Sequence, residues 1–382
     1  MTNLLKQQKR IPKLRFPGFD GEWEEKRLGE VCNFFDNERI PLKSTDRQKR
    51  SGKYAYYGAS GIIDYIDDYI FDGEYILLGE DGANIIDRSS KLAFLAKGKF
   101  WVNNHAHVLQ AIGSSYFLAE YLESLRYEKY NTGTAQPKLN SDVVKKIKIV
   151  IPKKEEQQKI AEFLGSVDDW ISNLRAQKEG LEKYKKGVMQ KIFSEGKDWE
   201  EKRLGEIGDV IGGGTPETSK GQFWNGEMNW FTPTEIKKKY SGESLRKIST
   251  EGLRNSSAKI LPVGALLLTT RATIGDVSIA MKESTTNQGF QSIVVNKKNS
   301  NEFMYYWILH NKKEFIKRAN GSTFPEISGK EVKKIKGWFP TLKEQQKIAE
   351  FLISLDNLIE SKQKQITLAE QWKKGLMQRL FV

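Results

Sequence analysis

The chain has 382 residues, which is enough for two ordinary domains, each with its own core. Its formal net charge of +13 at pH 7 suits a polyanionic partner such as a nucleic acid, although many basic proteins simply carry solvated lysine-rich faces. The single cysteine, Cys32, excludes an internal disulfide, and no spacing of Cys and His resembles a zinc site.

The N-terminal segment, residues 1–20, is basic and lacks the apolar stretch of a signal peptide. No other run approaches the roughly 18 apolar residues that a membrane span requires. We therefore expect a soluble, cytoplasmic protein that begins with a loosely held arm.

Residues 21–150 form the first predicted domain. Short apolar runs alternate with Gly and Asn breaks, as in EYILLGEDGANI from Glu74. Because Ile, Val and Tyr favour strands and breakers recur every few residues, this pattern predicts a mixed sheet. A short helix is expected over Ser115–Ser124. The first module is thus of the mixed α/β type.

The tract NNHAH provides the first polar candidates for ligand contact. Asn and His side chains can bond to base edges, and Asn can contact adenine through two hydrogen bonds, but the same groups can equally satisfy a buried turn. The two histidines point to one face of a strand, yet no third metal ligand accompanies them. The tract GKYAYYGASG adds aromatic side chains, although most aromatics in such a domain are core. The candidates are Lys53, Tyr56, Tyr57, Asn103, Asn104, His105 and His107.

A long helix is predicted over residues 151–193. Apolar residues recur every seven positions, and a heptad stripe sustained over several turns needs a partner helix. The alternative is a helix packed only on its own domain. The stripe consists of Ile160, Val167, Leu174, Leu181 and Val188.

The second predicted domain, residues 194–338, opens by repeating the tract WEEKRLGE of the first. It again mixes short strands with a helix expected over Asn301–Asn311. Arg271 suits guanine, although it can instead hold a phosphate, and Asn287 or Gln288 suits adenine. The further candidates are Thr273 in TTRATIGD and Trp224 in QFWNGEMNW.

Two loops at matching places, GTAQPK from Gly133 and GSTFPE from Gly321, differ in the residues that follow the glycine. Shared geometry with changed side chains is what two readers of different sequences require. This adds Gln136, Lys138, Ser322 and Thr323 to the candidates.

A second long helix, predicted over residues 339–382, repeats the first. The tract EEQQKIAEFL from Glu155 returns as KEQQKIAEFL, 188 residues later. We expect the two helices to form an antiparallel coiled coil with one globular module at each end. The second helix would then end near residues 17–23, which predicts a circular organisation with pseudo-two-fold symmetry.

The two helices end alike, in KKGVMQKIF and KKGLMQRLF, with apolar residues beside basic ones. These ends either pack on their own domains or form two equivalent docking sites for identical partners. The residues concerned are Lys186, Met189, Phe193, Lys374, Met377 and Phe381.

This order of duplicated helices and variable modules resembles the specificity subunit of type I restriction-modification enzymes over essentially the whole chain. The resemblance implies two target recognition domains that each read half of a split, double-stranded DNA sequence, with the helices setting their separation. It also implies two modification subunits that carry S-adenosylmethionine and methylate adenine, and restriction subunits that use ATP and Mg²⁺ to translocate and cleave DNA.

Catalysis by the chain itself is not expected. GGGTPETSK lacks the second glycine of a phosphate-binding loop, and no Asn-Pro-Pro-Tyr methyltransferase tract is present. We therefore expect a non-catalytic subunit without its own cofactor or metal. An architectural DNA- or RNA-binding protein with two modules is the alternative, but it has no need for matched helices with apolar ends.

Overall fold

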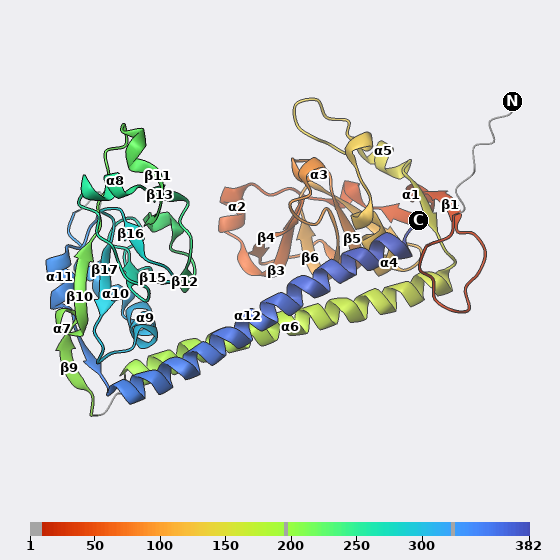
Figure 1. Ribbon diagram of the computed structural model, residues 1–382. Coiled ribbons are helices and arrows are strands. Elements are labelled where there is room, and N and C mark those ends of the chain that lie inside the picture. The colour runs from red at the N-terminus through yellow and green to blue at the C-terminus, as the bar shows by residue number, and fades with distance from the viewer. Residues whose placement is uncertain (1–9, 195–197, 322–324) are drawn as a thin grey trace. The chain divides into compact units, whose positions relative to one another are not determined.

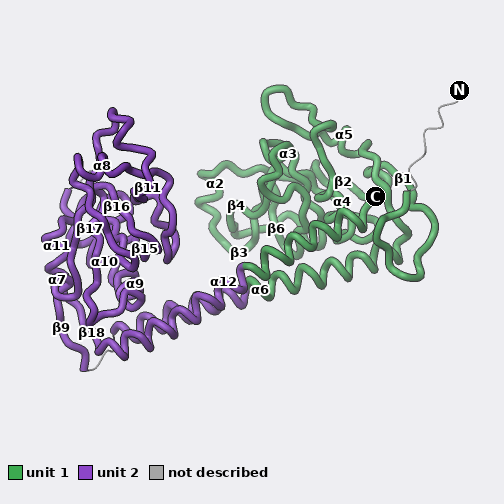
Figure 2. The backbone as a smooth tube through the Cα atoms, viewed as in Figure 1, with its two compact units in different colours: residues 1–175, 364–382 green, residues 176–363 purple. Residues whose placement is uncertain are grey.

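The computed structural model describes residues 10–194, 198–321 and 325–382 (Figure 1). It contains two compact units, which Figure 2 colours separately: unit 1 comprises residues 1–175 and 364–382, and unit 2 comprises residues 176–363. Each unit therefore holds one mixed α/β module together with a part of both long helices. None of the described helices is long and apolar enough to cross a membrane.

Unit 1 is built on a six-stranded sheet with the strand order β2-β7-β5-β6-β3-β4. β3 and β6 pair in parallel, and the other neighbours are antiparallel. A separate antiparallel ribbon joins β1 to β8. The strands are β1 (Glu24–Arg27), β2 (Cys32–Phe34), β3 (Ser51–Gly58), β4 (Gly61–Ile66), β5 (Phe71–Gly79), β6 (Ala93–Val102), β7 (Ala106–Ala111) and β8 (Lys148–Ile151).

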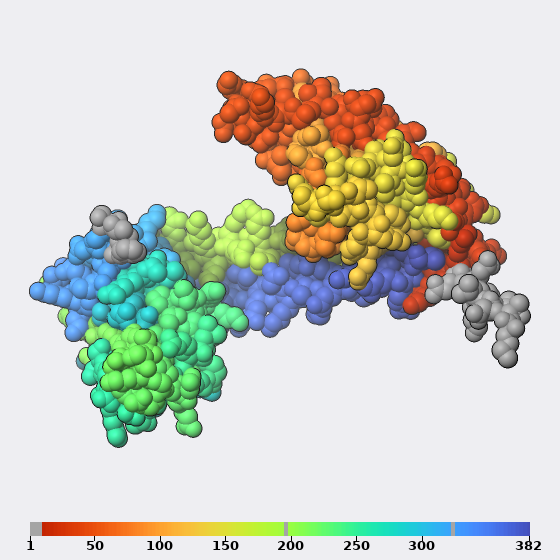
Figure 3. All heavy atoms as spheres, turned by 90° about the horizontal axis from the view of Figure 1, so that it is seen from above, coloured from red at the N-terminus to blue at the C-terminus, as the bar shows by residue number. Residues whose placement is uncertain are grey.

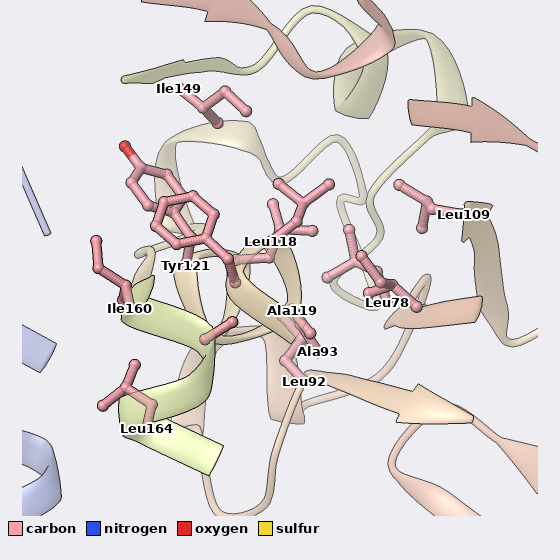
Figure 4. Close-up of a cluster of buried hydrophobic side chains, with 14 of the residues drawn as sticks. Leu78, Leu92, Ala93, Leu109, Leu118, Ala119, Tyr121, Ile149, Ile160 and Leu164 are labelled. Atoms are coloured by element: carbon pink, nitrogen blue, oxygen red, sulfur yellow. The ribbon is translucent and has the colours of Figure 1, made fainter. Parts of the chain in front are cut away.

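The main core of unit 1 lies between this sheet, helix α4 and the first turns of the long helix α6. Figure 4 shows Leu118 and Tyr121 of α4 among side chains from the strands and from α6, including Ile160. α4 occupies the residues predicted for it, and the Ser114 hydroxyl accepts a hydrogen bond from the Phe117 amide at its start. The helices are α1 (Leu28–Val31), α2 (Ser44–Gln48), α3 (Asn84–Asp87), α4 (Ser115–Ser124) and α5 (Ser141–Lys145), with 3₁₀ turns η1 (Asp36–Glu38) and η2 (Glu128–Tyr130).

Unit 2 has two sheets, ordered β10-β17-β14-β15-β12 and β13-β11-β16, and a ribbon of β9 and β18 that repeats the β1–β8 ribbon of unit 1. Its strands are β9 (Glu200–Arg203), β10 (Gly208–Gly212), β11 (Trp224–Phe231), β12 (Tyr240–Ser241), β13 (Arg246–Ile248), β14 (Leu266–Leu268), β15 (Val277–Ala280), β16 (Ser284–Thr286), β17 (Gln291–Val295) and β18 (Lys336–Phe339). Its helices are α7 (Leu204–Ile207), α8 (Thr250–Arg254), α9 (Asn301–His310), α10 (Lys312–Lys317) and α11 (Gly329–Lys334), with 3₁₀ turns η3 (Gly221–Phe223) and η4 (Pro233–Glu235).

The long helices are α6 (Lys154–Ser194) and α12 (Leu342–Leu380). Each begins three residues later than predicted, because the preceding residues finish a ribbon strand and pass through Pro152 or Pro340. In unit 1 the two helices run antiparallel, since Asp168 pairs with Lys373 at 2.7 Å and Arg175 with Glu370 at 2.5 Å. Three residues of the heptad stripe, Ile160, Val167 and Leu174, are buried in unit 1. Together with Ile171 they pack in one cluster with Ile366, Leu376 and Leu380 of α12.

The end of α12 lies beside the N-terminal segment within unit 1. The Leu14 amide donates to the Arg379 carbonyl at 2.8 Å, and Figure 3 shows the blue C-terminal helix against the red N-terminal chain. The Arg15 guanidinium also donates twice to Glu156 of α6, at 2.8 Å each. The circular organisation is therefore confirmed. Leu14 and Arg15 of the predicted arm are held by these contacts, and residues 1–9 of that arm lie outside the described residues.

Candidate nucleic-acid interface

In unit 1, three chain segments meet at one end of the six-stranded sheet: residues 80–82 after β5, the turn 103–105 between β6 and β7, and the loop 131–138. The Glu80 amide donates to the His105 carbonyl at 2.8 Å, and the Leu139 amide donates to the Glu80 carbonyl at 2.7 Å. Asp81 also forms an isolated β-bridge with Lys138. We call this region the loop end of unit 1.

Four predicted residues are exposed at this loop end, and two of them are held by carboxylates. His105 Nδ1 lies 2.9 Å from both oxygens of Asp81, and Lys138 Nζ lies 3.3 Å from Glu80. Glu80 also receives Arg39 Nη1 at 2.7 Å. The surface thus offers hydrogen-bond donors and acceptors on side chains of both charges. Base edges are recognised through such donors and acceptors. The four exposed residues are Asn104, His105, Gln136 and Lys138.

Three other predicted residues of unit 1 are buried and contact their own scaffold. His107 is 1% exposed, with its ring nitrogens 2.7 Å from Asp36 and from the Leu139 carbonyl. Tyr56 is 0% exposed, and its hydroxyl accepts from the Leu42 amide. Asn103, 6% exposed, uses its side-chain oxygen to hold the turn. These side chains stabilise the scaffold, as the structural alternative for NNHAH anticipated.

The remaining two candidates of unit 1 lie on β3. Tyr57 is half-buried against Phe94 and Phe100, and burial raises the pKa of its hydroxyl. Lys53 is exposed near the start of β3, whereas the loop end adjoins the other end of that strand, where the Asn103 amide donates to the Tyr57 carbonyl. Neither side chain belongs to the group of exposed polar residues at the loop end.

Unit 2 brings together the loop after β14, residues 269–276, the turn 287–289 and the segment around Glu326. We call this region the loop end of unit 2. Arg271 Nη2 lies 2.8 Å from Glu326, and both side chains are partly exposed, at 44% and 37%. Gln288 is exposed, and its side-chain oxygen accepts from the Thr215 hydroxyl. The loop end of unit 2 therefore presents a guanidinium, a primary amide and a carboxylate.

The other candidates of unit 2 have different positions. Thr273 closes the turn after Arg271, because its amide donates to the Arg271 carbonyl at 2.6 Å. Asn287 is partly buried and its side-chain oxygen accepts from the Gly289 amide. Trp224 is only 8% exposed beneath the Arg246 guanidinium, 3.6 Å from its ring centre, so its prediction as an exposed contact is wrong. Ser322 and Thr323 lie outside the described residues.

The two loop ends share one pattern of backbone hydrogen bonds. Asn103 and Asn287 each donate from the amide to the last or next-to-last residue of a strand, Tyr57 or Phe231. The side-chain oxygen of each asparagine then accepts, at 2.8 Å, the amide two residues later. Asn104 and Gln288, which follow these asparagines, are the exposed amides of the two turns.

Sequence reasoning missed Arg39, Glu80, Asp81, Thr215 and Glu326. Arg39 and Thr215 are distant in sequence from their partners at the loop ends, Glu80 and Gln288, and no local pattern marks them. Glu80 and Asp81 do carry a signal, because charged residues directly follow the apolar run YILLG. A polar pair at the end of a buried strand is a reasonable pointer to a site.

The apolar residues at the helix ends pack inside their own units. The Phe381 ring lies 5.6 Å from that of Phe117 and 5.3 Å from that of Tyr121, and the Phe193 ring lies 5.6 Å from that of Phe303. Met189 and Met377 are partly buried beside these cores, whereas Lys186 and Lys374 are exposed. This arrangement favours the packing alternative for the four apolar residues.

A different apolar surface is exposed on the helices, and we call it the helix ridge. In unit 1 it comprises Phe163, Trp170 and Trp372, with the two indoles 6.3 Å apart and each 49% exposed. Shifting these positions by the 188-residue repeat gives Phe351, Leu358 and Tyr184 of unit 2, which are 40%, 50% and 55% exposed. Both units thus carry three large apolar side chains at equivalent positions, and all of them are exposed except Phe163, which is partly buried against the core of unit 1.

Comparison with known proteins agrees with the duplicated organisation. The family model described as the type I restriction modification DNA specificity domain matches residues 20–183 and 196–371. The type I restriction enzyme MjaIX specificity subunit of Methanocaldococcus jannaschii is 38% identical over 191 residues, which are 49% of this chain and 44% of that protein. A putative type I restriction enzyme specificity subunit of Haemophilus influenzae is 27% identical over 90% of each chain.

The fold has solved counterparts. The type I restriction-modification S subunit from M. genitalium matches with a TM-score of 0.62 at 16% identity, over 97% of this chain and 99% of that one. A chain from a structure of type I restriction-modification complex assembly and conformational transition matches with a TM-score of 0.61 at 18% identity, over 96% and 98%. These likenesses concern the arrangement of helices and strands.

Proposed function

The chain belongs to the family of type I restriction-modification DNA specificity domains, and from this premise we propose that it gives a type I restriction-modification complex its DNA sequence specificity. Each unit would read one half of a split target in double-stranded DNA through its loop end. The observation that carries the proposal is the repeated hydrogen-bond pattern with different exposed side chains, Asn104 and Gln288 among them.

The physical argument separates scaffold from readout. The asparagines Asn103 and Asn287 and the strand ends fix the position of each turn, so that a change in an exposed neighbour alters chemistry without altering geometry. Base edges in the major groove differ in their pattern of donors and acceptors, and side chains held at fixed places can distinguish them. The net charge of +13 adds attraction for phosphates, which favours binding to any DNA sequence.

The long helices would fix the separation of the two half-sites and bind partners. We assign two modification subunits to the helix ridge, because the same three positions carry large apolar side chains in both units and all but Phe163 are exposed. Exposed apolar side chains that recur at equivalent positions suit two copies of one partner. Lys186 and Lys374, exposed near the helix ends, would lie at the rim of these sites.

Catalysis would belong to the partner subunits. In this proposal the modification subunits bind S-adenosylmethionine and methylate adenine, and the restriction subunits use ATP and Mg²⁺. The chain would contribute recognition and spacing.

Modified-base sequencing tests the proposal. The chain is expressed with its modification subunit in cells whose DNA lacks N6-methyladenine, and cells with the modification subunit alone serve as the control. We expect a new split motif that appears only when the chain is present. A stable complex that leaves the DNA without such a motif would contradict the specificity role and favour an architectural binder.

A further inference from the structure

Asp81 and Arg271 occupy the same place in the two loop ends. The residue before each, Glu80 or Thr270, donates its amide to the carbonyl of the corresponding turn, at 2.8 Å in both units. The carbonyl of that same residue accepts an amide from the returning loop, at 2.7 Å in unit 1 and 3.2 Å in unit 2. The backbone directly before Asp81 and Arg271 is thus held between the same two neighbours in both units.

The side chains at this shared place have opposite charges. Asp81 accepts from the His105 ring, and its side chain is 24% exposed. Arg271 pairs with Glu326, and its side chain is 44% exposed. The neighbouring residue is reversed in charge as well: Lys138, which forms a β-bridge with Asp81, is a cation, whereas Glu326, 188 residues later, is an anion that pairs with Arg271. The two units therefore present inverse hydrogen-bonding chemistry from one backbone frame.

Neither group is committed to a buried interaction. Ion pairs between partly exposed side chains contribute only about 0–1 kcal/mol, so Arg271 can exchange Glu326 for another acceptor at little cost. Two donors of a guanidinium match O6 and N7 of guanine. The Asp81 carboxylate keeps lone pairs beyond those that face His105, and it can accept from the N4 amino group of cytosine.

We propose that Asp81 and Arg271 are equivalent specificity-determining residues, Asp81 reading a cytosine in one half-site and Arg271 a guanine in the other. This inference rests on the proposed function, because it requires that the loop ends contact DNA. It adds that the residues at one equivalent backbone position, Asp81 and Arg271, make the two half-sites differ in sequence.

The test compares the motifs methylated by complexes of the full chain with its modification subunit. Arg271→Ala is expected to relax one guanine position in one half-site, and Asp81→Ala one cytosine position in the other, each lowering discrimination about 10- to 100-fold. Arg271→Lys keeps the charge but loses the two-donor fork, so it should relax the same guanine position. Normal thermal unfolding identifies variants that remain folded.

Matched controls come from ion pairs elsewhere in each unit. Lys336→Ala removes an exposed cation that lies 2.8 Å from Glu201 on the β9–β18 ribbon, and Asp67→Ala removes the carboxylate 2.9 Å from Arg50. Both controls should leave the motif unchanged. Because Arg271→Lys preserves charge and is mild, it also covers the case in which Arg271→Ala fails to fold.

Failure of the inference and failure of the proposed function give different results. A wild-type complex without any split motif would contradict the proposed function. A wild-type motif that persists with full selectivity in Arg271→Ala, Arg271→Lys and Asp81→Ala would overturn the inference alone. Equal weakening on all DNA sequences would also overturn it, because that is the behaviour of a phosphate contact.

Discussion

The two units share side-chain contacts where the long helices meet the modules, and they differ in the exposed side chains of their loop ends. In unit 1, Asp168 of α6 accepts from Lys373 of α12 and from the Tyr116 hydroxyl of α4, at 2.8 and 2.5 Å. In unit 2, Asp356 accepts from Lys185 and from the Tyr306 hydroxyl of α9. Both aspartates and both lysines are related by the repeat of 188 residues.

The contact between a tyrosine hydroxyl and the aspartate is present in both units, although the tyrosine stands at different positions of the short helix. Ser114 and Ser300 both cap the short helix, and counted from these caps Tyr116 matches Glu302, whereas Glu120 matches Tyr306. Tyrosine and glutamate have exchanged places one helical turn apart, and each tyrosine still reaches its aspartate. Burial and the neighbouring carboxylate raise the pKa of both hydroxyls, which therefore stay protonated donors. The helix junction is maintained while the loop ends diverge.

The two junctions are expected to differ most in how much their lysines contribute to the free energy of unfolding. Lys373 is almost enclosed, 2.8 Å from Glu120 and 2.7 Å from Asp168, with 10% of its side chain exposed. Lys373→Ala leaves the buried Glu120 with only the more distant Lys91, at 3.4 Å, and removes the lysine partner of Asp168, so it should lower the free energy of unfolding by about 3 kcal/mol. Denaturant unfolding with hydrogen exchange resolved by segment measures the loss and locates it in unit 1.

Lys185→Ala is the matched change in unit 2. Lys185 and Asp356 are 19% and 32% exposed, so solvent replaces more of the lost interaction, and about 1 kcal/mol is expected. Losses of equal size in the two units would contradict the view that burial sets the contribution of the lysine.

An effect between those of Lys373→Ala and Lys185→Ala is expected from the buried glutamines at the start of the long helices. Gln157 and Gln345 each donate to a proline carbonyl at 2.9 Å, and each accepts the amide of the capping serine, Ser114 at 3.3 Å or Ser300 at 2.9 Å. Either Gln→Ala substitution should cost about 1–2 kcal/mol, because an amide is left without its partner. Thermal unfolding measures it, with exposed Gln158→Ala and Gln346→Ala as controls near zero.

The sequence predicted the elements better than the exposed surface, for physical reasons. The stripe from Ile160 to Leu174 and the repeated tract EEQQKIAEFL reflect local periodicity and duplication, and both are visible in one chain. Whether Tyr56 or Lys53 faces solvent depends on which strands and loops cover β3, and that is decided by contacts between distant residues. The tract NNHAH indicates polar side chains at a turn, yet only the fold shows that Asn103 holds the turn while Asn104 faces outward.

The smallest expected difference between the units is a dependence on pH confined to unit 2. His310 ends α9 with its ring 5.1 Å from that of Phe193, and burial lowers its pKa below the ordinary value of 6.5. The unfolded chain therefore binds the proton first as the pH falls below 6.5, so unit 2 should lose stability between that pH and the lower pKa of the folded state. Above pH 6.5 both states are neutral at this ring and the effect disappears.

Hydrogen exchange of α9 at pH 7.5 and 5.5 should show faster opening at the lower pH after correction for intrinsic exchange, and His310→Gln should abolish the change. Because α4 of unit 1 ends in Ser124 at the matching position, its exchange is the internal control. An equal acid response of α4 and α9 would assign the effect to the acidic groups that both units share.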